Sequence, residues 1–174
     1  MIYLPDLEAR VCALYNAVNT LFEWICYVLM VVLVAITSVQ VFLRYVLKSP
    51  FDWAEEVSLL ILIWFGMLAV AIAVYRHTHM VIWVAWDRLS PRLQYLVNIG
   101  VELLTIAFAV NIALNAQPLI DIVAGQYLPA SGLPNTWLYY SLEFGGGLMV
   151  FNAIGNILLD HFPTNTPNPE IGGM

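Results

Sequence analysis

Residues 24–75 decide the fold of this chain. They read WICYVLMVVLVAITSVQVFL over 24–43, RYVLKSPFDWAEE over 44–56 and VSLLILIWFGMLAVAIAVY over 57–75. Each apolar stretch is long enough to cross a hydrocarbon core of roughly 30 Å at about 1.5 Å per residue. The polar connector between them holds five of the eighteen charged residues of the chain. The whole stretch therefore predicts a transmembrane helical hairpin with a charged turn.

The overall composition predicts an all-α integral membrane protein. Apolar residues make up 61% of the 174 residues and charged residues only 10%. A water-soluble domain of this size cannot bury that much apolar surface. The net charge of −6 comes from scattered carboxylates, so we expect no nucleic-acid partner. Cys12 and Cys26 lack Cys-x-x-Cys spacing and are expected to be inert thiols.

The pattern of apolar runs predicts a membrane domain over residues 19–161 with spans at about 19–47, 54–76, 92–121 and 136–160. Residues 1–18 have an amphipathic pattern, which fits either an interfacial helix or the leading turns of the first span. We expect residues 78–89, with Trp83 and Trp86, to lie in the headgroup region. Residues 162–174 are rich in Pro and Asn and are expected to be disordered. No cleavable signal peptide is expected, because the N-terminus is acidic and the first apolar run is long.

The start of the second span carries helix-capping signals. Ser49 is placed to cap the helix with Pro50 at its first position, and Asp52 with Glu55 has the spacing of a second capping box. Glu55 and Glu56 fall in the first turn, where the helix dipole favours anions. Capping is therefore the expected role of these carboxylates.

Arg44 ends the first span beside these carboxylates. One interpretation is that Arg44 and the carboxylates form a gate or a substrate clamp. The other, which we favour, is that Arg44 extends to the membrane surface and pairs across the turn, stabilising the hairpin.

Surfaces for packing against other helices are predicted on the second and third spans. Small residues recur on the second span at Gly66, Ala69 and Ala73, which would let another helix approach closely. The third span has two opposite polar faces, one with Asn98, Glu102 and Thr105 and the other with Asn111, Asn115 and Pro118. Ionisable groups at membrane depth usually face protein or water, so Glu102 should not point at lipid.

The fourth span combines glycines with a polar face. Glu143 precedes the run Gly145-Gly-Gly147, which is either a weak point or a close-packing site. Asn152, Asn156 and Asp160 share one helical face.

Two sets of residues suggest chemistry, but neither is convincing. The candidate ligands of a metal or haem are His77, His79 and His161, and all three are expected at helix ends rather than inside facing helices. The candidate residues of an ion path are Glu23, Glu102 and Glu143, and they have no spacing that enforces proximity. We expect no catalytic residue, metal site or cofactor.

The chain resembles a known family in its motifs. The residues that carry the resemblance are Arg44, Ser49-Pro50, Asp52, Trp53, Glu55-Glu56, Trp64, Gly66 and Arg76-x-x-His79, with Gly125-Gln126, Pro129, Pro134 and Trp137 further on. Together they are similar to the small membrane subunit of tripartite ATP-independent periplasmic (TRAP) transporters, the DctQ-like family. The resemblance spans most of residues 20–160.

The resemblance implies a bacterial inner-membrane protein that packs against a large multi-span transport subunit. It also implies a periplasmic substrate-binding protein as a further partner, and sodium-coupled uptake of an organic acid such as a dicarboxylate or a sialic acid. By this analogy the small subunit extends a stationary scaffold and donates no substrate ligand. The second and third spans are then the expected contact surfaces.

Basic residues predict the orientation. With four spans, Arg10, Arg76, Arg88 and Arg92 lie on one side and Arg44 and Lys48 on the other. Because cytoplasmic loops are enriched in Lys and Arg, both termini are expected in the cytoplasm.

Two other functions remain open from the sequence. A four-helix subunit can hold haem or quinone as the membrane anchor of an oxidoreductase, and a small helical protein can act alone as a channel or exporter.

Overall fold

The structure is a computed structural model that describes residues 4–49, 51–76 and 90–159, and the regular elements of these residues are all helices. The helices are α1 (Leu4–Phe42), which continues into a π-helical turn η1 (Leu43–Leu47), then α2 (Asp52–Tyr75), α4 (Pro91–Val123) and α5 (Thr136–Leu158).

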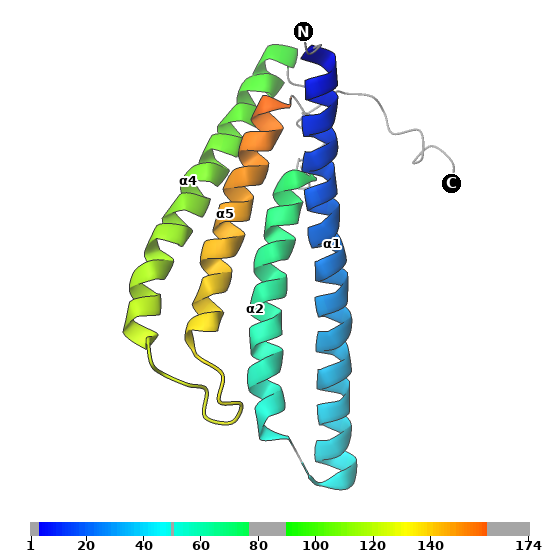
Figure 1. Cartoon of the computed structure of the whole chain (residues 1–174), viewed down its shortest axis with the longest axis vertical. Helices are drawn as coiled ribbons and strands as arrows, with labels where there is room; N and C mark the ends of the chain where they lie inside the picture. Colours follow the sequence, from blue (N-terminus) through cyan, green and yellow to red (C-terminus); the bar gives the residue numbers. More distant parts are fainter. Residues whose placement is uncertain (1–3, 50, 77–89, 160–174) are drawn as a thin grey trace, which may run out of the picture.

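The four long helices stand side by side in an order that differs from their order in the chain (Figure 1). α5 lies between α4 and α2, and α2 lies between α5 and α1. α1 and α4 are therefore the outer helices. The turn between α1 and α2 and the loop between α4 and α5 lie at the same end of the molecule, and α1 begins at the opposite end.

The core is built from small side chains and glycines that allow close helix contact. Ala71, Val74, Ala109 and Ala153 are completely buried. A Cβ atom added to Gly145 would lie 2.7 Å from the Met67 Cβ atom, and one added to Gly146 would lie 3.0 Å from the Ala109 carbonyl oxygen. Of the two interpretations of the glycine run, close packing is thus the one that the structure supports.

Three of the described helices have the length and hydropathy of membrane spans: Arg10–Leu47, Asp52–Tyr75 and Leu93–Val123. α5 has 23 residues, enough to cross a membrane, but its sequence includes asparagines and a serine that lower its hydropathy. These polar residues, Ser141, Asn152 and Asn156, are buried against the other helices. Three candidate spans are therefore established, and a fourth through α5 remains a prediction.

The N-terminal residues belong to the first long helix. α1 runs without interruption from Leu4 to Phe42, so the chain has no break near residue 18. The expected interfacial segment at 78–89 and the tail at 162–174 lie outside the described residues.

The capping expected at the start of α2 is wrong. The residue in the N-cap position is Phe51, in an extended conformation, and no side chain makes a cap hydrogen bond. The reason is a shift of the boundary: Phe51 has no side-chain oxygen, and with Phe51 as the cap Glu55 falls one residue beyond the capping-box position. Glu55 contacts Arg44 instead.

Candidate functional site

Two groups of hydrogen-bonded polar residues connect the helices, one at each end of the molecule. We call the first the amide cluster, comprising Tyr15, Asn19, Glu102, Asn152 and Asn156. We call the second the loop anchor, comprising Glu56, Ala130 and Ser131. Neither group is evident from sequence spacing, because most of their hydrogen bonds join residues that are far apart in the chain.

Asn156 on α5 is the centre of the amide cluster, and its side chain reaches all three other helices. Its Nδ2 atom donates to the Val74 carbonyl oxygen on α2 at 3.0 Å and to Glu102 Oε1 on α4 at 2.9 Å. Its Oδ1 atom accepts a hydrogen bond from the Tyr15 hydroxyl of α1 at 2.9 Å. One completely buried side chain thus joins four helices.

Asn152 contacts two of these helices, α1 and α2, one turn earlier on α5. Its Nδ2 atom donates to the Ala71 carbonyl oxygen on α2 at 2.8 Å, and its backbone carbonyl oxygen accepts from the Tyr15 hydroxyl at 3.1 Å. Asn19 donates to the Tyr15 carbonyl oxygen at 3.1 Å. Because a buried polar group without a partner costs about 1–3 kcal/mol, these bonds fix the relative positions of the helices as well as stabilising them.

The loop anchor joins the two hairpins at the other end. The Glu56 carboxylate on α2 accepts hydrogen bonds from the Ala130 N–H at 3.0 Å, from the Ser131 N–H at 2.7 Å and from the Ser131 hydroxyl at 2.7 Å. The loop itself is held by Leu128 N–H donating to Leu133 O at 2.8 Å. Gly132 has φ +69° there, a conformation that favours glycine. A folded loop is thus bound by one carboxylate.

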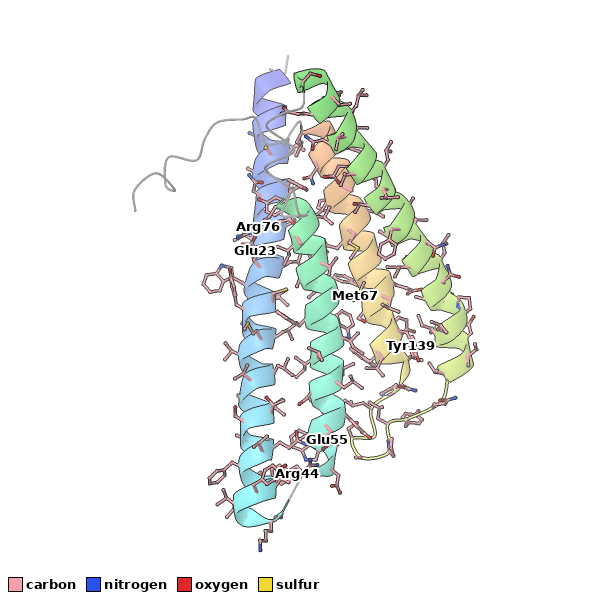
Figure 2. The ribbon with its side chains drawn as sticks, turned by 180° about the vertical axis from the view of Figure 1, so that it is seen from behind. Glu23, Arg44, Glu55, Met67, Arg76 and Tyr139 are labelled. Carbon is pink, nitrogen blue, oxygen red and sulfur yellow. The ribbon has the colours of Figure 1, made fainter. Side chains whose placement is uncertain are left out.

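Two ion pairs lie at opposite ends of the α1–α2 hairpin (Figure 2). Arg76 Nε donates to Glu23 Oε1 at 2.7 Å, and Arg44 contacts Glu55 through Nη2 and Oε1. On both helices the paired residues are twenty-one residues apart, which corresponds to about 31 Å of α-helix. This matches a hydrocarbon core of roughly 30 Å, so we expect each ion pair to lie near a boundary of the bilayer core.

The Glu23 carboxylate also affects the ionisation of Arg76, which follows the last residue of α2. Its hydrogen bond and negative charge raise the pKa of the Arg76 guanidinium further above its ordinary value. The Glu23 carboxylate thus stabilises the charged form of Arg76 at the end of α2.

The family-motif residues are placed as follows. Arg44 and Glu55 are paired and exposed, and Glu56 is in the loop anchor rather than paired with Arg44. Asp52 and Trp53 are exposed. Pro50 and His79 lie outside the described residues, as do His77, His161 and Asp160.

Some of the residues predicted to pack against other helices are buried within this chain, and others are exposed. Glu102 is buried in the amide cluster and Asn98 is half-buried, whereas Asn111 and Asn115 are exposed. A Cβ atom added to Gly66 would meet nothing within 4 Å.

Other residues of the α2 stripe border open space. Ala69 and Ala73 line a groove of about 290 Å³ between α1 and α2, at the Glu23–Arg76 pair. The small-residue stripe thus faces a groove at Ala69 and Ala73, and at Gly66 no other described helix is in contact with it.

Sequence reasoning missed the role of Tyr15 and the pairing of Glu56 with the loop. The available signal for the first was the four-residue spacing of Tyr15 and Asn19, which matches that of Asn152 and Asn156. For the second there was no signal, because a capping residue and a hairpin-tip residue look alike in sequence.

Fold and polar contacts together define a class: a multi-helix membrane protein whose buried polar side chains join its own helices. Sequence comparison identifies the family within this class. Residues 33–161 match the family model described as Tripartite ATP-independent periplasmic transporters, DctQ component. The chain therefore belongs to the DctQ family, the small permease component of TRAP transporters, and it is a transporter subunit rather than an enzyme.

Curated relatives agree with this membership. The chain is 28% identical over 149 residues to the sialic acid TRAP transporter small permease protein SiaQ of Vibrio cholerae, covering 83% of each chain. It is 22% identical over 137 residues to a putative TRAP transporter small permease protein of Haemophilus influenzae, covering 79% of this chain and 85% of that protein.

A third relative has a different length. The sialic acid TRAP transporter permease protein SiaT of Haemophilus influenzae is 26% identical over 144 residues, which cover 79% of this chain but only 22% of that protein. A counterpart of this chain is therefore one part of a much longer polypeptide there.

Proposed function

We propose that this chain is the scaffold subunit of a TRAP transporter in a bacterial inner membrane. It packs against the large permease subunit, and the complex carries out sodium-coupled uptake of an organic acid delivered by a periplasmic binding protein. The chain itself supplies helix-packing surfaces and no substrate ligand.

The observation that carries this proposal is the amide cluster. The Asn156 side chain holds α1, α2 and α4 at once, so these helices cannot move against one another without breaking its hydrogen bonds. Because these bonds are buried, separating the helices would leave several polar groups without partners. Such a chain is suited to keep one shape while another subunit moves.

Orientation and substrate are also proposals. The basic residues support cytoplasmic termini, which would place the loop anchor and the Arg44–Glu55 pair on the periplasmic side. Two relatives are named for sialic acid, so an organic acid is the substrate class that we propose.

The test compares this chain alone with the complete system in proteoliposomes. We expect sodium-dependent uptake only when the large permease and the binding protein are present. Uptake by this chain alone would contradict the scaffold proposal and support a self-sufficient channel.

A cross-link provides a second arm of the test. A Cβ atom on Gly146 would lie 3.3 Å from the Ala113 Cβ atom, close to the separation found in disulfides. In a background with Cys12 and Cys26 replaced, Ala113→Cys with Gly146→Cys should lock α4 to α5 on oxidation. Uptake per complex should be the same before and after reduction, and a cross-link that abolishes uptake reversibly would overturn the proposal.

A further inference from the structure

The outer helix α4 has a buried side and an opposite side that no described element covers. Buried positions recur along one face at Glu102, Ala109, Ala116 and Ile120. At about 100° per residue, Asn111, Asn115 and Pro118 lie on the opposite face, and all three are exposed. We call this face, with Leu114, the outer amide face.

The outer amide face lies near the middle of the bilayer. Glu102 is bonded to Asn156, which also bonds Val74, two residues before Arg76 at the membrane boundary. Asn111 is nine residues further along α4 than Glu102, about 13 Å deeper at 1.5 Å per residue. That depth is close to half of a core of roughly 30 Å.

Polar groups at this depth are unusual unless protein covers them. The Asn115 Nδ2 atom donates to the Asn111 carbonyl oxygen at 2.7 Å, which leaves the Asn111 carboxamide and the Asn115 Oδ1 atom for an outside partner. Pro118 has no N–H, so the Leu114 carbonyl lacks the donor that a helix normally supplies four residues on. Hydrocarbon cannot hydrogen-bond any of these groups.

We infer that the outer amide face binds a transmembrane helix of the large permease subunit, one that carries hydrogen-bonding side chains among apolar ones. This inference rests on the proposed function. It deepens that function because it assigns the contact with the large permease to one of the two polar faces of α4 and not to the small-residue stripe of α2.

One observation favours the large permease over a second copy of this chain. A relative contains the counterpart of this chain within a polypeptide of which it covers 22%, so a long companion segment accompanies this subunit there. The exposed carboxamides of Asn111 and Asn115 offer both donors and acceptors to a partner helix. Exposed apolar side chains flank the amides, Phe108 at 61% and Ile122 at 70%, as expected of a helix-packing surface.

The first experiment measures co-purification of the large permease with Asn111→Leu/Asn115→Leu. Hydrogen bonds between membrane helices are individually modest, so the retained large permease should fall about fivefold to twentyfold. The thermal stability of the isolated subunit should not fall. Gln117→Leu is the matched control, since it removes an exposed carboxamide from the same helix about 160° from Asn115 and should retain the large permease. Equal retention in the double variant and the control would overturn the inference.

The second experiment places a photo-reactive benzoylphenylalanine at position 115 and, as a control, at Val31 on α1, which is 68% exposed. An adduct of position 115 with the large permease supports the inference. An adduct with a second copy of this chain, or no protein adduct, contradicts it. If the unmodified chain fails to co-purify with the large permease at all, the proposed function itself fails. If it co-purifies but position 115 gives no such adduct, only the choice of surface is wrong.

Discussion

At the scale of single residues, polar side chains in this protein join helices rather than bind a substrate. Asn156 and Asn152 lie on a helix that also carries several glycines, so the helix can approach its neighbours closely enough for short side chains to reach their backbones. Carboxamides suit this role because each offers both donors and an acceptor without a charge.

Asn156→Leu should destabilise the isolated subunit by about 2–4 kcal/mol, because the apolar side chain fills the site but leaves the Tyr15 hydroxyl and other buried groups short of a partner. Thermal unfolding in detergent measures this loss. Asn115→Leu makes the same chemical change at an exposed position and should alter stability by less than about 0.5 kcal/mol. Equal effects of the two substitutions would show that the amide cluster does not hold the bundle together.

Glu56→Gln tests the loop anchor. The amide replaces one acceptor oxygen by a donor group, so the Ala130 and Ser131 N–H groups cannot both be satisfied as before. Hydrogen exchange over residues 128–133 should accelerate by about tenfold or more, because the loop opens more often. Glu55→Gln, which alters only the exposed pair with Arg44, should leave exchange in this loop unchanged. Unchanged exchange in Glu56→Gln would refute the anchor.

At the scale of elements, contact between α4 and α5 depends on one glycine of three in a row. Gly146→Val should destabilise the subunit by about 1–3 kcal/mol, because its side chain would meet the Ala109 carbonyl oxygen and Ala113. Gly147→Val is the neighbouring control: a Cβ atom there meets nothing within 4 Å, so stability should change little. Detergent unfolding curves of the two variants check this, and similar curves would contradict the packing described for α5.

Which elements the sequence predicts, and which it does not, follows from the range of the interactions. Three spans and the charged turn after Arg44 could be predicted because apolar length and local charge are properties of neighbouring residues. The start of α2 was misplaced because a hydrogen-bond-capable Ser49 near the boundary looks like a cap even when Phe51 occupies that position. The contact of Tyr15 and Glu102 with Asn156 could not be predicted, because it depends on the order of the helices in space.

At the scale of the whole molecule, the amide cluster, the loop anchor and the two ion pairs connect the helices at two levels, which we expect to be the two boundaries of the membrane. The amide cluster joins the helices near the Glu23–Arg76 pair, and the loop anchor joins the two hairpins near the Arg44–Glu55 pair. A bundle tied at both boundaries resists tilting of one helix against another. This property is what a stationary subunit requires if its partner moves during transport.

The most direct test of the scaffold account is the substrate dependence of initial uptake, measured per assembled complex, for Asn156→Ala in proteoliposomes with the large permease and the binding protein. A scaffold residue that makes no contact with substrate should reduce the number of complexes while KM stays within about twofold of the unmodified protein. A KM raised about tenfold or more, with a normal amount of complex, would show that this subunit takes part in handling the substrate and would contradict the account.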